Sequence, residues 1–141
     1  MAAIKDCIEF ANENPICFLA TDDNGQPRVR ALGFWFADGT GFYFQTSSMK
    51  ELHKQISHNP NVEACYYKTG TTAGKMLRIA GEIEFIADRK YKEKALIDRP
   101  FLKEMGLTPD SKELILFKIA HGKAHFWTLA NNLKPKEIIE F

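Results

Sequence analysis

A short stretch between Gly25 and Lys50 carries the side chains best suited to binding an anion. Arg28 and Arg30 stand two residues apart, so in a strand both side chains point to the same face of a sheet. Like charges that lie side by side on a sheet repel each other, and an anion beside them relieves the repulsion. Arginine also holds phosphate with two parallel hydrogen bonds. The pair predicts a phosphate contact, with two solvated surface side chains as the alternative.

Hydroxyl groups and a lysine follow, where a predicted strand gives way to a predicted helix. Thr46, Ser47 and Ser48 stand at this junction, and Lys50 falls in the expected first helical turn. Free backbone N–H groups and the helix dipole favour an anion there and disfavour a lone cation. We therefore expect Arg30, Lys50 and the three hydroxyls to form a phosphate cradle. A plainly capped helix with a solvated lysine is the alternative.

Hydrophobic periodicity and turn residues predict the elements that position these groups. We expect helices at residues 2–13, from 47 or 48 to 59, and at 88–98, with a helical turn and loop over 101–112. Expected strands are 16–21, 28–37, 42–46, 62–68, 76–86, 114–120 and 124–129, the last two forming a hairpin turned at His121-Gly122. The first three strands, joined by two short turns, predict an antiparallel meander. This order favours an antiparallel β-barrel with helices at its ends over a doubly wound sheet.

Composition restricts the class of protein further. The chain has 141 residues, of which 45% are hydrophobic and 26% charged, so we expect one globular domain over residues 1–141. A net charge of +1 gives no general attraction to nucleic acid or to an anionic membrane. We expect no signal peptide and no membrane-spanning helix. Three scattered cysteines predict a reducing, cytoplasmic location, and the histidine spacing predicts no metal site.

The order of these motifs resembles a known family. GQPRVR between two strands, an aromatic strand, the Ser/Thr-rich helix start with Lys50, and Asn59-Pro60 are similar to the pyridoxamine 5′-phosphate oxidase-like group of FMN-binding split barrels. Gly81 within RIAGEIEFI and the aromatic end at Phe126-Trp127 extend the resemblance over residues 16–128. The resemblance implies a mainly β split barrel with flanking helices. It further implies a homodimer with FMN between its subunits, acting as an oxidoreductase on a small planar substrate.

The resemblance also implies a set of cofactor-binding residues. By position, Arg30 and Lys50 match the phosphate-binding residues, and residues 31–35 match the strand that runs along the flavin. Trp127 matches an aromatic residue that reaches FMN from the partner, although packing at an interface is its alternative role. The full expected set is Arg30, Ala31, Leu32, Gly33, Trp35, Tyr43, Phe44, Gln45, Thr46, Ser47, Ser48, Lys50, Met76 and Trp127.

Departures from the family pattern bear on the activity. The oxidases carry an arginine–histidine pair shortly after the tryptophan, and neither residue follows Trp127 in this chain. Trp35 stands where the oxidases have a lysine. The chain is thus more similar to small, nitroimidazole-reductase-like members than to true pyridoxamine phosphate oxidases. No side chain is evident as an acid, a base or a nucleophile. A non-catalytic flavin or electron-transfer protein stays an alternative, as does a deazaflavin or haem protein, for which His125 is the candidate ligand.

Overall fold

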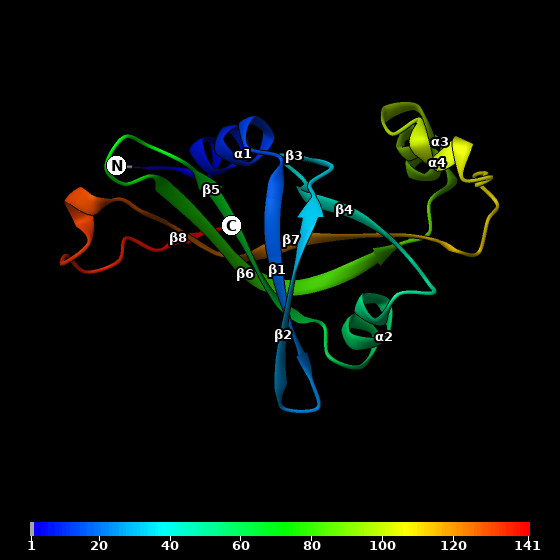
Figure 1. Cartoon of the computed structure of the whole chain (residues 1–141), viewed down its shortest axis with the longest axis horizontal. Coiled ribbons are helices and arrows are strands. Elements are labelled where there is room, and N and C mark those ends of the chain that lie inside the picture. Colours follow the sequence, from blue (N-terminus) through cyan, green and yellow to red (C-terminus); the bar gives the residue numbers. More distant parts are fainter. Residues whose placement is uncertain (1) are drawn as a thin grey trace.

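Eight strands form one sheet in which every neighbouring pair is antiparallel (Figure 1). The structure is a computed structural model and describes residues 2–141. The strand order is β2-β1-β5-β6-β7-β4-β3, and β8 pairs with β7. The strands are β1 Ile16–Asp23, β2 Gln26–Gly33, β3 Phe36–Asp38, β4 Gly41–Ser47, β5 Asn61–Lys68, β6 Lys75–Ile86, β7 Leu114–Trp127 and β8 Ile139–Glu140. The helices are α1 Ile4–Glu13, α2 Glu51–His58, α3 Arg89–Asp98 and α4 Phe101–Glu104, with a 3-10 turn η1 at Leu129–Asn131.

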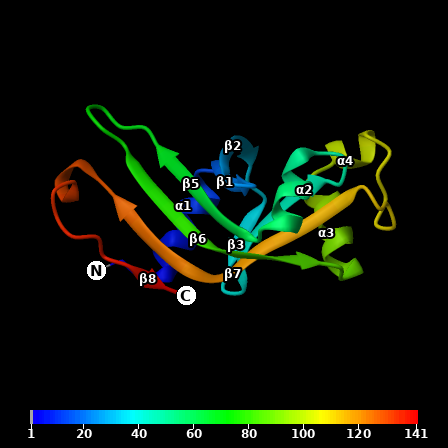
Figure 2. The same cartoon turned by 90° about the horizontal axis from the view of Figure 1, so that it is seen from below.

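The sheet curves around a core of aromatic and aliphatic side chains, with α1 and α2 packed against it (Figure 2). Phe34 contacts Tyr66 with ring centroids 5.0 Å apart, and Phe44 stacks on Phe117 at 5.0 Å. In β1 the inward residues are buried and alternate with outward ones, as the period of two requires. The expected mainly β architecture is confirmed. No helix within residues 2–141 has the length and apolar character needed to cross a membrane.

The predicted strand 28–37 is wrong, because the chain breaks at Phe34 and Trp35 into β2 and β3. Phe34 turns into the core, and its N–H donates to the Pro15 carbonyl at 2.6 Å. β2 then pairs with β1 and β3 with β4, so the two hairpins occupy the two ends of the sheet order. The expected three-stranded meander therefore does not form.

The predicted hairpin at His121-Gly122 is also wrong, since β7 continues unbroken from Leu114 to Trp127. Gly122 lies opposite Gly81 of β6, beside an irregularity in the pairing. A Cβ added to Gly122 would come within 2.1 Å of the Ala80 carbonyl oxygen. The glycine therefore permits close approach of two long strands rather than a reversal of the chain.

The start of α2 differs from the prediction as well. The helix begins at Glu51, so Lys50 is its N-cap residue rather than a residue of the first turn. Ser48 and Glu51 have the sequence spacing of a capping box but make no capping contact, and the Ser47 hydroxyl accepts from the Met49 N–H at 3.2 Å instead. Other boundaries are confirmed: α2 ends before Asn59, and the Asp88 carboxylate caps α3.

Candidate functional site

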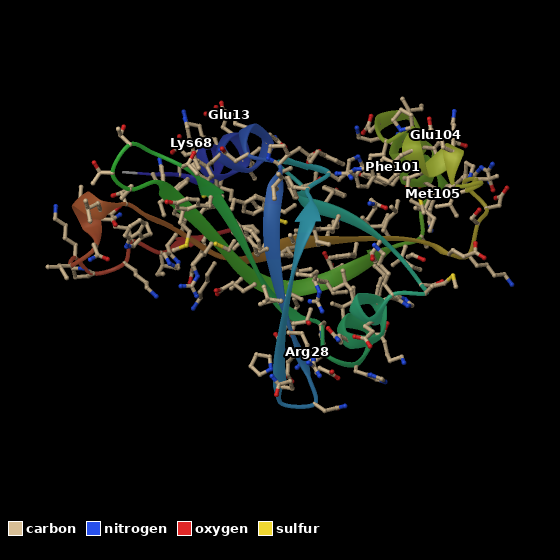
Figure 3. The ribbon with its side chains drawn as sticks, in the orientation of Figure 1. Glu13, Arg28, Lys68, Phe101, Glu104 and Met105 are labelled. Atoms are coloured by element: carbon tan, nitrogen blue, oxygen red, sulfur yellow. The ribbon has the colours of Figure 1, made fainter. Side chains whose placement is uncertain are left out.

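A hollow of about 410 Å³ lies between β2 and α2 and gathers most of the predicted phosphate-binding charge. Arg28 and Arg30 enter it from β2, and Lys50 enters it from the start of α2. Glu51 is the one carboxylate in its lining, against three cationic side chains. Figure 3 shows Arg28 on the β-hairpin that projects beside α2. The two segments are separated by the whole of β3 and β4, so the fold brings Arg30 and Lys50 together.

The guanidinium of Arg30 is held in place by a buried polar network. It donates to the Thr21 hydroxyl at 2.8 Å, to the Leu19 carbonyl at 3.2 Å and to the Gln55 Oε1 at 2.5 Å. The Thr21 hydroxyl also donates to Gln55 Oε1, at 2.6 Å, and both of these residues are buried. A guanidinium has five N–H groups, so three internal bonds leave two for a ligand. The network thus fixes the direction in which Arg30 presents its charge.

Electrostatics in this hollow favour an anion. Burial lowers the pKa of Arg30, the neighbouring Arg28 lowers it further, and Glu51 acts in the opposite direction. No side chain within residues 2–141 caps the N-terminus of α2, so its first N–H groups are free of side-chain acceptors. An anion placed here would meet two N–H groups of Arg30, the Lys50 ammonium and the positive end of a helix.

The remaining predicted residues of this stretch separate into two groups. Ala31 and Leu32 line the hollow, and Gly33 follows them on the same strand, where its carbonyl accepts from Arg99 at 2.9 Å. Gln45, Ser47 and Ser48 lie outside the hollow, toward the end of β4 and the connection to α2. The structure thus places Ala31 and Leu32 in the hollow beside Arg30, whereas Gly33 and the three residues near α2 lie outside it.

Three predicted aromatic contacts lie elsewhere. Tyr43 is fully buried between the rings of Phe36 and Tyr91, with centroids 4.4 and 5.3 Å away. Phe44 belongs to the core. The Trp35 indole N–H donates to Asp98 of α3 at 2.9 Å. These side chains hold β3, β4 and α3 together, and they do not reach the hollow within this chain.

Thr46 is a buried hydroxyl without a hydrogen-bond partner among the described residues. An unpaired buried hydroxyl costs about 1–3 kcal/mol, so a native structure rarely leaves one without a reason. Thr46 lies near the end of β4, four residues before Lys50. This orphaned donor fits the hypothesis that a polar ligand group binds near the junction of β4 and α2.

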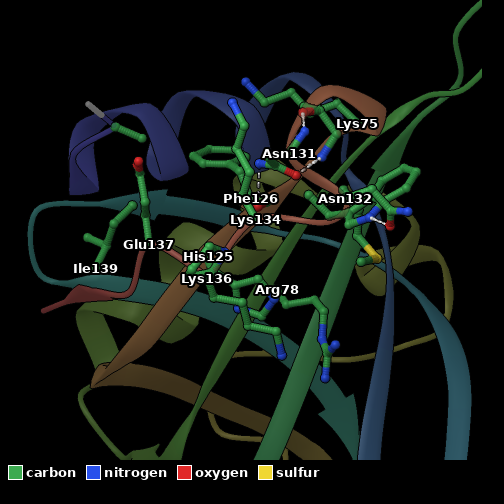
Figure 4. A pocket seen from close by; sticks show the side chains of 15 residues that line it. Lys75, Arg78, His125, Phe126, Asn131, Asn132, Lys134, Lys136, Glu137 and Ile139 are labelled. Carbon is green, nitrogen blue, oxygen red and sulfur yellow. Dashed lines mark hydrogen bonds between the residues drawn. The ribbon is translucent and has the colours of Figure 1, made fainter.

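Met76 and Trp127 line a second cavity of about 400 Å³ at the far ends of β6 and β7 (Figure 4). They are direct cross-strand partners. The indole N–H of Trp127 donates to the Asn132 side-chain oxygen at 2.8 Å, which fixes the ring. None of the residues that line the hollow at Arg30 lines this cavity. The predicted phosphate contacts at Arg30 and Lys50 therefore lie apart, within one chain, from the predicted flavin contacts at Met76 and Trp127.

The outer face of the sheet extends from one site to the other. The strand register places Ala31, Phe18, Cys65, Arg78 and His125 in one row across five strands. Large apolar side chains lie open on this face: Val29 is 69% exposed, Ile16 64% and Phe18 44%. Such a concentration of exposed apolar side chains is typical of a surface that another molecule covers.

Sequence reasoning missed the residues that support Arg30. Gln55 stands on the apolar side of α2 between Leu52 and Ile56, and Thr21 continues the inward alternation of Cys17 and Leu19. Both residues are polar at positions that the hydrophobic periodicity assigns to the core. This mismatch could have indicated a buried polar network. A buried polar side chain needs a partner, and here the partner is Arg30.

Comparisons with known proteins agree with this architecture. Residues 3–128 match the sequence profile of the pyridoxamine 5′-phosphate oxidase family. A pyridoxine/pyridoxamine 5′-phosphate oxidase of Burkholderia mallei is 21% identical over 108 residues, which cover 77% of this chain and 49% of the relative. The chain thus spans about half the length of the curated relatives it matches.

Solved structures show the same fold. A NimC/NimA family protein from Clostridium acetobutylicum superposes with a TM-score of 0.80 at 28% identity, covering 97% of this chain and 92% of that one. A haem-binding protein from Mycobacterium smegmatis superposes with a TM-score of 0.76 at 14% identity, covering 99% of this chain and 58% of that one. The second likeness, at this identity, concerns the fold alone.

The family is one of flavin-binding, oxidoreductase-like proteins that bind FMN or FAD, and its members are generally dimers with the flavin at the subunit interface. The profile match covers nearly the whole chain. The strand order and the helices at the ends of the sheet are those of a split barrel. The chain therefore belongs to the pyridoxamine 5′-phosphate oxidase family.

Proposed function

We propose that this protein binds FMN between two copies of the chain and acts as an oxidoreductase on a small planar substrate. The observation that carries the proposal is the hollow at Arg30. Its guanidinium is fixed by Thr21 and Gln55, and Lys50 and the N-terminus of α2 face the same space. A fixed arginine beside a lysine and a helix N-terminus is chemically matched to a phosphate monoester dianion.

The chain's own residues would bind and orient the cofactor. Arg30 and Lys50 would hold the phosphate, and the small side chain of Ala31 beside them leaves the backbone of β2 accessible to a flat ring. When bound, FMN supplies the electron transfer, and the protein contributes binding, orientation and electrostatics. The unpartnered Thr46 hydroxyl near the β4–α2 junction fits an additional hydrogen bond to the cofactor.

A second copy of the chain is the occupant that we propose for the outer face. The face joins the hollow at Arg30 to the cavity at Trp127, and its exposed apolar side chains need cover. Pairing two such faces would bring the Trp127 end of one copy toward the Arg30 end of the other. Such a pairing would account for the separation of the two sets of contacts within one chain.

An equilibrium titration with FMN, followed by quenching of flavin fluorescence, tests the proposal. We expect saturable binding of one FMN per chain. Lys50→Ala removes a charge at the hollow and should weaken FMN binding about tenfold, the effect of losing one charged hydrogen bond. Lys54→Ala is the matched control, because Lys54 is an exposed lysine of the same helix that does not line the hollow.

Either of two results would overturn the proposal. One is the absence of FMN binding by protein shown to be folded, in which case a deazaflavin and haem would be titrated next. The other is an equal effect of Lys50→Ala and Lys54→Ala, which would reduce Lys50 to a general contributor of surface charge. Turnover of reduced protein with candidate acceptors, compared with free FMN, separates an enzyme from a non-catalytic flavin protein.

A further inference from the structure

One end of the cavity at Trp127 is lined by basic side chains that the proposed FMN contacts do not use. Arg78 of β6 and His125 of β7 are direct cross-strand partners on the outer face of the sheet. Lys136 approaches them from the C-terminal segment that follows η1. Figure 4 shows His125, Lys136 and Arg78 gathered together, whereas Glu137 points to another part of the cavity. Three nitrogen-bearing side chains thus meet from three segments.

The C-terminal segment is fixed at both of its ends. The Thr128 hydroxyl accepts from the Asn131 N–H, and the Asn131 side chain accepts from the Thr128 N–H at 2.9 Å. Farther along, Gly122 and Phe141 exchange two backbone hydrogen bonds, of 3.0 and 3.1 Å, beside the pairing of β8 with β7. These bonds hold the intervening residues, Lys136 among them, over the cavity.

The charges around His125 are unbalanced. Arg78 is paired with Glu63, but Lys136 forms no ion pair with any described residue. Burial lowers the pKa of His125, and Lys136 and Arg78 lower it further, while Glu63 acts weakly in the opposite direction. Burial and, after it, the two neighbouring cations therefore favour the neutral form of the imidazole. An anion bound among the three groups would stabilise the imidazolium and gain a third charged contact.

We propose that Arg78, His125 and Lys136 bind the anionic group of the substrate, a small organic carboxylate or phosphate. That this anion is the substrate rests on the proposed function, because Met76 and Trp127 line the same cavity. Anion binding itself does not depend on FMN. The two cationic sites of one chain then have separate tasks: Arg30 and Lys50 hold the cofactor, and the site around His125 selects the substrate by its charge.

Nuclear magnetic resonance of the imidazole tests this site directly. Protein with and without FMN would be titrated with inorganic phosphate and with benzoate at constant ionic strength, while the His125 ring resonances are followed. We expect a saturable shift of these resonances and a rise in the pKa of His125 when the probe is bound. Lys136→Gln should weaken probe binding about tenfold and leave the FMN affinity unchanged.

Lys123→Gln is the control. Lys123 lies on β7, two residues before His125, but does not line the cavity. The proposal fails if neither probe changes the His125 resonances, or if Lys123→Gln weakens binding as much as Lys136→Gln does. It also fails if Lys50→Ala abolishes the response, since the probe would then occupy the cofactor's phosphate position. Loss of FMN binding with a retained His125 response would refute only the proposed function.

Discussion

Replacing Gln55 by leucine tests how the cationic hollow is built. Gln55 Oε1 accepts from both Thr21 and Arg30, so the leucine leaves a buried hydroxyl and a guanidinium each short of one partner. Leaving the buried hydroxyl proton of Thr21 without an acceptor costs about 1–3 kcal/mol, and losing the bond to the charged group costs about 1.5–3 kcal/mol. Burying more apolar surface recovers part of this, so we expect a loss of about 3 kcal/mol. In a chain of 141 residues that lowers Tm by roughly 10 °C.

Thermal unfolding followed by circular dichroism measures this effect, and an FMN titration accompanies it. We expect FMN affinity to fall about tenfold, since Arg30 loses one of the bonds that orient it. Gln55→Glu is the informative companion. It keeps an acceptor for both hydrogen bonds but cancels the charge of Arg30, so it should lower FMN affinity more than Gln55→Leu and destabilise less. A Tm of Gln55→Leu within about 2 °C of the unchanged protein would refute the network's structural role.

Three further predictions concern the sheet. Gly122→Ala should prevent native pairing of the two long strands, giving a large fall in Tm or no folded protein, while Gly39→Ala, in open space, leaves Tm nearly unchanged. Burial raises the pKa of the Cys17 thiol from 9.0 to about 12. The unfolded chain therefore loses this proton first, and the free energy of unfolding should fall as the pH rises from 9 toward 12; a smaller fall is expected for Cys17→Ala in urea titrations. If two outer faces pair as proposed, Phe18→Asp should give a lower sedimentation coefficient than the unchanged protein, and equal coefficients would contradict that pairing.

Local patterns in the sequence predict those elements whose causes are local. The carboxylate of Asp88 at a helix start, Asn59-Pro60 at a helix end and the alternation of Cys17 and Leu19 each depend on neighbours a few residues away. The mainly β class and the family followed from the order of such elements. Arg30 and Lys50 were predicted by residue type and by position in the family pattern; they line one hollow, and their role in binding phosphate stays a prediction.

The failures of prediction have long-range causes. His121-Gly122 has the composition of a turn, yet Gly122 faces Gly81, a partner that no local window contains. Phe34 ends β2 because it is drawn into the core beside Tyr66, far along the chain. The support that Gln55 gives to Arg30 likewise joins a helix to a strand through a contact visible only after folding.

The two tryptophans give this protein a pair of built-in optical reporters. The Trp35 indole is bonded to Asp98 of α3, and the Trp127 indole is bonded to Asn132 just after η1; these two elements lie at opposite ends of the molecule (Figure 1). In Trp35→Phe, all indole emission would come from the cavity at the end of β7. Titrating that variant would record ligand arrival through one residue, whereas Trp127→Phe would leave emission that follows only the attachment of α3 to the sheet.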